Sequence, residues 1–144
     1  MQPEYIIIHH SLTKDSGTVS WQAIRRYHKN ELGWRDIGYH FGIEDVNGEY
    51  EVLVGRNLND TGAHCKEQGM NNKSVGICFV GNFDEGKPDN KLWDKGVNLV
   101  KGLSDILHIS PSKIFGHRYF AGYKSCPGNL FDIDKFKYEV SVIK

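Results

Sequence analysis

The sequence lacks several features that would place it in a specialised class of protein. Lys and Arg together number 18, as do Asp and Glu, so the formal net charge is zero. A nucleic-acid-binding domain should carry a basic excess, so this balance argues against that class. No apolar run approaches the ~20 residues that a membrane-spanning helix needs. We therefore expect neither a nucleic acid nor a membrane as a partner.

Cysteine is scarce, and its odd number does not suggest a disulfide framework. Cys78 lies in an apolar run over residues 75–80, where a thiol behaves as a small buried apolar group. Cys126 instead lies in a polar loop, after Lys124-Ser125 and before Pro127-Gly128, which favours a chemical role.

A strand-like segment begins within four residues of the start, which leaves no room for a signal peptide. We therefore expect the chain to be made and folded in a cytoplasm.

The hydrophobic pattern predicts one domain in which strands and helices interleave. The length of 144 residues suits a single domain with a sizeable core. Continuous apolar runs, alternating segments around Asn47-Gly48 and helical periodicity predict strands and helices. The expected strands cover residues 5–9, 39–44, 49–54, 74–81 and 114–116, and the expected helices cover 20–32, 90–108 and a short segment after Asp132. Residues 11–17 are turn-rich, and 56–73 form a long polar loop. We expect an α/β fold with a central mixed β-sheet flanked by helices.

The loop over residues 116–129 concentrates groups that suit metal chemistry. It holds His117, Lys124 and Cys126. Imidazole and thiolate both bind zinc, and a nearby ammonium can stabilise developing negative charge. A third ligand must come from elsewhere, and either His9 or His10 at the end of the first strand could supply it. Adjacent strand residues point to opposite faces, so only one of the two can face His117, and strand geometry alone does not decide which.

Several motifs in order resemble the zinc-dependent N-acetylmuramoyl-L-alanine amidases, a family that includes phage lysozyme-type endolysins and the peptidoglycan recognition proteins. The motifs are Ile8-His9-His10-Ser11, Gly33-Trp34-Arg35-Asp36-Ile37-Gly38-Tyr39-His40-Phe41, Gly62-Ala63-His64, Asn71 with Ser74-Val75-Gly76-Ile77, and Gly116-His117-Arg118 with Cys126-Pro127-Gly128-Asn129. Each motif alone is weak, but five in order at suitable spacing are specific. The resemblance covers roughly residues 5–138.

The resemblance implies roles for individual residues. It points to His9, His117 and Cys126 as ligands of one Zn²⁺, and to Tyr39 and Lys124 as catalytic residues. The muropeptide-recycling branch carries Asp at the position of Cys126, so the Cys indicates the phage and recognition-protein branch.

Other positions matched by the resemblance bear on the substrate and on the base. His64 and Asn71 are expected to line the groove for the glycan–peptide stem, and Trp34 is expected to pack under the sheet rather than stack on sugar. The recycling branch has a catalytic Glu where this chain has Cys78. No Glu is therefore available there as a general base.

The implied function is hydrolysis of the amide between N-acetylmuramic acid and L-alanine in peptidoglycan by a phage or prophage endolysin. We expect residues 1–144 to form one monomeric catalytic domain without a separate wall-binding domain, acting on the wall after release from the host cytoplasm. One alternative is a module that binds peptidoglycan or a muropeptide without cutting it. A second is a metal-free thiol hydrolase built on Cys126 and His117, with Lys124 lowering the thiol pKa.

Overall fold

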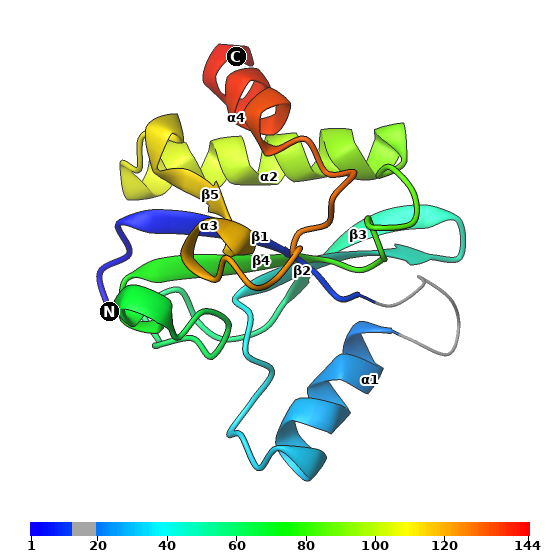
Figure 1. Cartoon of the computed structure of the whole chain (residues 1–144), viewed down its shortest axis with the longest axis vertical. Coiled ribbons are helices and arrows are strands. Elements are labelled where there is room, and N and C mark those ends of the chain that lie inside the picture. The colour runs from blue at the N-terminus through cyan, green and yellow to red at the C-terminus, as the bar shows by residue number, and fades with distance from the viewer. Residues whose placement is uncertain (13–19) are drawn as a thin grey trace.

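Five strands form one sheet in the described part of the chain, which in this computed structural model comprises residues 1–12 and 20–144. The strand order is β3-β2-β4-β1-β5. Their bounds are Tyr5–His10 for β1, Phe41–Val46 for β2, Glu49–Val54 for β3, Ser74–Phe79 for β4 and Ile114–Gly116 for β5. β1 pairs in parallel with β4 and β5, β2 pairs in parallel with β4, and β3 runs antiparallel to β2 (Figure 1). The predicted mixed sheet is confirmed.

The β2–β3 hairpin turns where the sequence predicts. Asn47 and Gly48 both have positive φ, 56° and 89°, which is the backbone that a tight two-residue turn requires. β2 itself begins two residues later than predicted. Tyr39 and His40 precede it, but the His40 amide still donates to the Gly76 carbonyl at 2.9 Å, so both residues stay beside β4.

Helices α1 and α4 begin at a capping side chain within or next to the predicted ranges. Ser20 caps α1 by accepting from the Ala23 amide, and Asp132 caps α4 by accepting from the Lys135 amide. The bounds are Trp21–Arg26 for α1, Asn90–Leu107 for α2, His117–Phe120 for α3 and Ile133–Val142 for α4. α1 continues as a π-helical turn over Tyr27–Glu31, and 3₁₀ turns cover Glu67–Asn72 and Pro111–Lys113. None of the helices described is long and apolar enough to cross a membrane.

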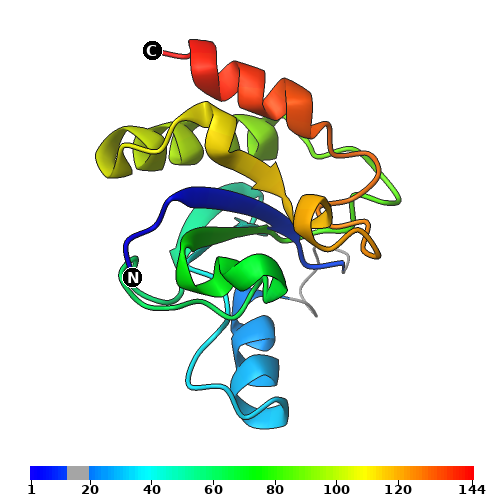
Figure 2. The same ribbon diagram turned by 60° about the vertical axis from the view of Figure 1, so that its left-hand side comes forward.

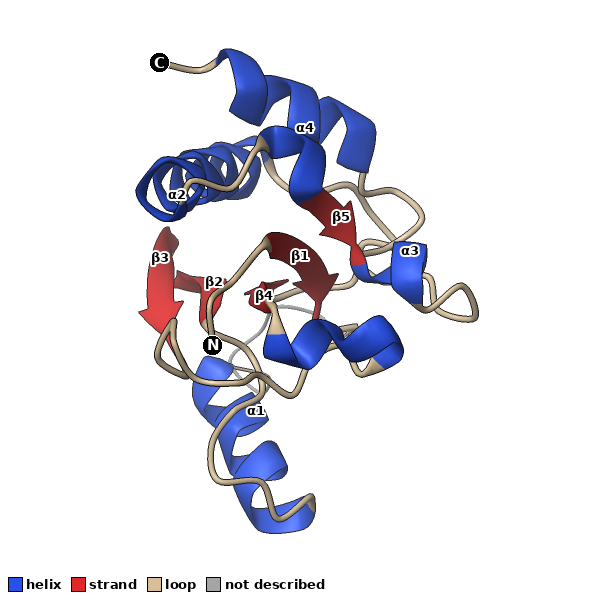
Figure 3. Ribbon diagram, turned by 90° about the vertical axis from the view of Figure 1, so that its left-hand side faces the viewer, coloured by secondary structure: helices blue, strands red, loops and turns tan. Residues whose placement is uncertain are grey.

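The sheet lies between two helical layers. α2 and α4 cover one face, and α1 packs on the other (Figures 1 and 3). The segment Glu67–Asn72 lies on the same side as α1, as the view in Figure 2 shows. In β1, Ile6 and Ile8 belong to the core beneath α2, whereas Ile7 packs with residues of the opposite face. The turn-rich stretch predicted for residues 11–17 falls mostly outside the described residues.

Candidate metal centre and active site

The alternation along β1 separates the two neighbouring histidines. His9 follows Ile7 onto the face opposite α2, and it is 2% exposed. His10 points to the other side, where its ring stacks on Phe83 and its Nδ1 accepts from the Phe83 amide at 3.1 Å. His9 is therefore the histidine that faces His117, and its role as a metal ligand stays a prediction.

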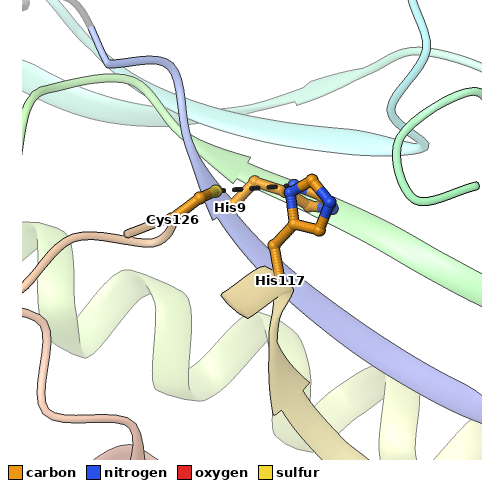
Figure 4. A group of neighbouring side chains, drawn as sticks. All are labelled: His9, His117 and Cys126. Atoms are coloured by element: carbon orange, nitrogen blue, oxygen red, sulfur yellow. Dashed lines mark hydrogen bonds between the residues drawn. The ribbon is translucent and has the colours of Figure 1, made fainter. Parts of the chain in front are cut away.

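His9, His117 and Cys126 converge at the carboxyl ends of the parallel strands. Ile8 of β1 pairs with Gly116 of β5, so the next residues, His9 and His117, lie side by side. Their ring centroids are 4.6 Å apart. The Sγ of Cys126 lies 3.6 Å from the Nδ1 of His9, and one donor atom from each of the three residues falls within 4.8 Å of the others (Figure 4).

The loop that carries Cys126 is held by backbone and side-chain bonds. The Arg118 amide donates to the Cys126 carbonyl at 2.8 Å, and the Arg118 guanidinium donates to the Gly128 and Phe131 carbonyls. The His10 amide points at the Cys126 sulfur at 3.4 Å. Cys126 is thus positioned by α3, which shortly precedes it, and by the end of β1, which is far from it in sequence.

Burial sets the protonation of the three groups in the absence of a metal. It lowers the pKa of His9 well below its usual value, with His64 and His117 adding to the effect. Burial also lowers the pKa of His117, assisted by the charge of Lys124. The Cys126 thiol has its pKa raised to about 12, mainly by burial. At neutral pH the site therefore offers two neutral imidazoles, and a metal ion would displace the thiol proton.

Two predicted catalytic residues, Tyr39 and Lys124, line the cavity beside this cluster. The cavity has a volume of about 530 Å³, and His117 and Cys126 also line it. The Tyr39 ring lies 5.2 Å from that of His9. Burial, followed by the nearby Cys78 and Cys126 thiols, raises the pKa of Tyr39 well above its usual value, so its hydroxyl keeps its proton. Lys124 is exposed and lies over the Tyr123 ring.

The predicted substrate residues, His64 and Asn71, make internal contacts. His64 is 8% exposed, and its Nδ1 lies 2.8 Å from the Nε2 of His9. The Asn71 side-chain oxygen accepts from the amides of His64 and Cys65 at 2.7 and 2.8 Å. Both residues line a smaller cavity of about 230 Å³ that shares His117 and Lys124 with the first. Contact of His64 and Asn71 with a substrate stays a prediction.

Trp34 differs from its expected position. Instead of packing under the sheet, it packs on His28, with ring centroids 4.6 Å apart, and it lines both cavities. His28 also lines the larger cavity, and its Nδ1 accepts from the Gly38 amide at 3.0 Å. The π-helical turn that ends α1 carries His28 to this position.

Glu67 is a site residue that the sequence did not single out. Its Oε1 lies 3.6 Å from the Nε2 of His117, and its Oε2 accepts from the Tyr123 hydroxyl at 3.0 Å. Cys65, Glu67 and His117 form a second group whose donor atoms lie within 4.8 Å of one another. The pKa of the Cys65 thiol is raised to about 11 by burial, so this thiol stays protonated at neutral pH. The one signal in the sequence that could have pointed to Glu67 was its place in the long, polar 56–73 loop.

Fold and site together define an α/β protein with two imidazoles and a thiol gathered at the edge of a cavity. A family profile described as N-acetylmuramoyl-L-alanine amidase matches residues 1–129. The chain belongs to this family.

Peptidoglycan-recognition proteins and phage endolysins are both similar to the chain. The peptidoglycan-recognition protein SC2 of Drosophila melanogaster is 37% identical over 134 residues, which cover 86% of this chain and 67% of that protein. The endolysin of Enterobacteria phage K11 is 34% identical over 131 residues, which cover 90% of this chain and 82% of the endolysin. Among solved structures, the N-acetylmuramoyl-L-alanine amidase LysC from Clostridium intestinale URNW superposes with a TM-score of 0.82 at 27% identity, covering 99% of this chain and 87% of LysC. These similarities confirm the predicted family and fold.

Proposed function

We propose that the protein is a zinc-dependent amidase that hydrolyses the bond between N-acetylmuramic acid and L-alanine in peptidoglycan. The observation that carries this proposal is the convergence of His9, His117 and Cys126 at a cavity that Tyr39 and Lys124 also line. A chain of the amidase family that keeps all three donors, with a cavity open beside them, has the parts of a catalyst.

The donor set fits zinc in an open site. Two imidazole nitrogens and one sulfur are ligands that Zn²⁺ prefers, and catalytic zinc sites use three protein ligands with the fourth position left to water or substrate. When bound, zinc would polarise the amide carbonyl and lower the pKa of its water to about 7. His9 offers its Nδ1 toward Cys126, since its Nε2 is engaged by His64.

The chain's own residues then complete the chemistry. Lys124 brings an ammonium to the cavity wall, where it can stabilise negative charge that develops on the amide oxygen. Tyr39 keeps its proton because burial raises its pKa, so it acts as a hydrogen-bond donor to the reacting groups rather than as a free base. Cys78 lies buried beneath Tyr39 and supplies no carboxylate.

A non-catalytic binding module is the second candidate, because several similar proteins are named for recognition. A solved structure of Drosophila PGRP-LB, 32% identical to this chain, is a complex with tracheal cytotoxin. The presence of Cys126 together with both histidines favours the enzyme. A metal-free thiol hydrolase is disfavoured, since burial raises the pKa of Cys126 to about 12 and leaves little thiolate.

The similarity to phage endolysins supports a role in lysis of the host wall. The endolysin of Enterobacteria phage T3 is 34% identical over 92% of this chain. We propose that the protein degrades the wall from the cytoplasmic side after the membrane is breached. Permeabilised cells should then lose turbidity on addition of the protein, while intact cells should not.

Product analysis on purified peptidoglycan separates these functions. An amidase releases new amino termini of L-alanine and no new sugar reducing ends. Sedimentation of the protein with peptidoglycan, without any new amino termini, would instead identify a binding module. Activity that survives a chelator and is lost on thiol alkylation would identify the thiol hydrolase.

A further inference from the structure

The Nε2 atoms of His9 and His117, the two histidines assigned to the metal, face side chains from one short segment, residues 62–74. The Nε2 of His9 meets His64, and the Nε2 of His117 meets Glu67. Neither partner is among the three residues assigned to the metal. The same segment therefore lies behind both imidazoles.

The hydrogen bonds around His64 have one consistent direction. The Ser74 hydroxyl donates to the Met70 carbonyl at 2.6 Å, so its oxygen can only accept from the His64 Nε2, which lies at 3.3 Å. The proton of His64 therefore sits on Nε2, and its Nδ1 must accept from the Nε2–H of His9. His9 is thereby held in the tautomer whose Nδ1 lone pair faces Cys126.

His117 is held less tightly. Its ring is 7% exposed, and its Nε2 has no hydrogen-bond partner among the described residues. Glu67 stands nearest, with its Oε1 at 3.6 Å, just beyond bonding distance. The other carboxylate oxygen of Glu67 is anchored by the Tyr123 hydroxyl, so Glu67 also connects His117 to the loop of Lys124 and Cys126. Figure 4 shows one nitrogen of the His117 ring turned toward Cys126 and His9.

We propose that His64 and Glu67 are positioning residues of the metal centre, which accept the Nε2–H of His9 and His117 and leave both Nδ1 atoms free to bind metal. This inference rests on the proposed zinc site. Metal-bound histidines ordinarily donate their second N–H to such a partner, which fixes the tautomer and the ring orientation. The segment expected to bind substrate thus also sets the affinity for the metal.

Glu67 gives the sharper test, because its side chain is partly exposed and it can be changed without emptying the core. In Glu67→Ala the affinity for Zn²⁺, measured by competition with a chromophoric chelator, should fall about 10–100-fold. Glu67→Gln keeps an acceptor oxygen and should recover part of that loss. Glu51→Ala, an exposed carboxylate of β3, is the matched control and should bind zinc as the wild type does.

Proton positions on the rings provide a readout that general damage to the fold would not move. Long-range ¹H–¹⁵N spectra of the metal-free wild type should show His9 and His117 protonated on Nε2. Glu67→Ala should give His117 mixed tautomers with His9 unchanged, and His64→Ala should do the reverse. If Glu67→Ala folds and keeps both the zinc affinity and the tautomers of the wild type, this inference is wrong but the proposed function stands. The same holds if His9 of the wild type is protonated on Nδ1. Failure of the wild type to bind zinc would overturn the proposed function as well.

Discussion

The rings of His9 and His64 meet nitrogen to nitrogen at 2.8 Å, nearly perpendicular to one another at 88°. Two neutral imidazoles in this arrangement need one donor and one acceptor, so one proton lies between the facing nitrogens and the acceptor ring carries its own proton on its other nitrogen. Burial supports this state, because it lowers the pKa of both rings, that of His64 to about 3. The relationship explains how a strand end and a distant loop act as one unit in the site.

Removal of the Lys124 ammonium should slow the reaction without removing the metal. We expect Lys124→Ala to lower turnover about 10²–10³-fold, the usual effect of losing one stabiliser of developing charge. Zinc content should stay unchanged, since a Lys ammonium has no lone pair to offer a metal and His9, His117 and Cys126 supply the donor atoms. Lys95→Ala, an exposed lysine of α2 on the far face of the sheet, is the control. Initial rates on purified peptidoglycan measure both, and a Lys124→Ala enzyme as fast as the control contradicts the assigned role.

The hydroxyl of Tyr39 should contribute to turnover by donating a hydrogen bond. Because burial holds its pKa well above the usual value, Tyr39→Phe should lower turnover by a similar factor at every pH across the neutral range. If Tyr39 instead acted as a base that titrates in this range, the loss would depend on pH. A pH profile of turnover for both proteins distinguishes the two roles. Unchanged turnover in Tyr39→Phe would remove Tyr39 from the mechanism.

Two glycines of α2 should respond in opposite ways to alanine. A Cβ at Gly96 would overlap the Phe79 ring, whereas nothing lies within 4 Å of a Cβ at Gly102. We expect Gly96→Ala to lower the free energy of unfolding by about 1–3 kcal/mol, as overpacking does. Gly102→Ala should raise it by about 0.5–1 kcal/mol, the helix propensity gained. Urea unfolding measures both, and equal shifts in the two variants would contradict this packing of α2 on the sheet.

His40 should make stability depend on pH. Its Nδ1 accepts from the Gly76 amide at 3.0 Å and its Nε2–H donates to the Asp60 carbonyl at 2.8 Å, so a second proton would break the first bond. Burial is the main reason that its pKa lies below the usual 6.5. Below pH ~6.5 the unfolded chain therefore binds more protons than the folded one, and stability falls as the pH drops.

The size of this effect is bounded. One proton contributes at most about 1.4 kcal/mol per pH unit to the free energy of unfolding. Other buried histidines add to the slope, so the comparison needs His40→Gln, which cannot titrate. Urea unfolding of the metal-free proteins between pH 7.5 and 5 should give a shallower slope for His40→Gln. Identical slopes would show that His40 takes up no extra proton on unfolding.

Local signals in the sequence predicted much of the fold. The short strand Ile114–Gly116 and the turn at Asn47-Gly48 lie where expected, because strand-forming residues after a Pro break and positive-φ turns are local features of the sequence. The structure brings together His9, His117 and Cys126, the three residues that the resemblance implied as ligands, and their binding of zinc stays a prediction.

Other features depend on contacts that no local pattern encodes. The choice of His9 over His10 follows from which face of β1 packs beneath α2. The position of Glu67 depends on a 3₁₀ segment in which Gln68 and Gly69 both take positive φ, at 54° and 70°. Trp34 was expected under the sheet, and only the path of the chain after α1 brings it to the cavity.

Zinc dependence of amide cleavage tests the central claim most directly. The wild type, stripped by a chelator and then given one equivalent of Zn²⁺, should lose and regain the release of L-alanine amino termini from purified peptidoglycan. Cys126→Ser, treated in the same way, should bind zinc more weakly and regain little activity at one equivalent. Release of amino termini that persists in the stripped wild type, or that returns fully in stripped and reloaded Cys126→Ser, would contradict a metal centre built on His9, His117 and Cys126.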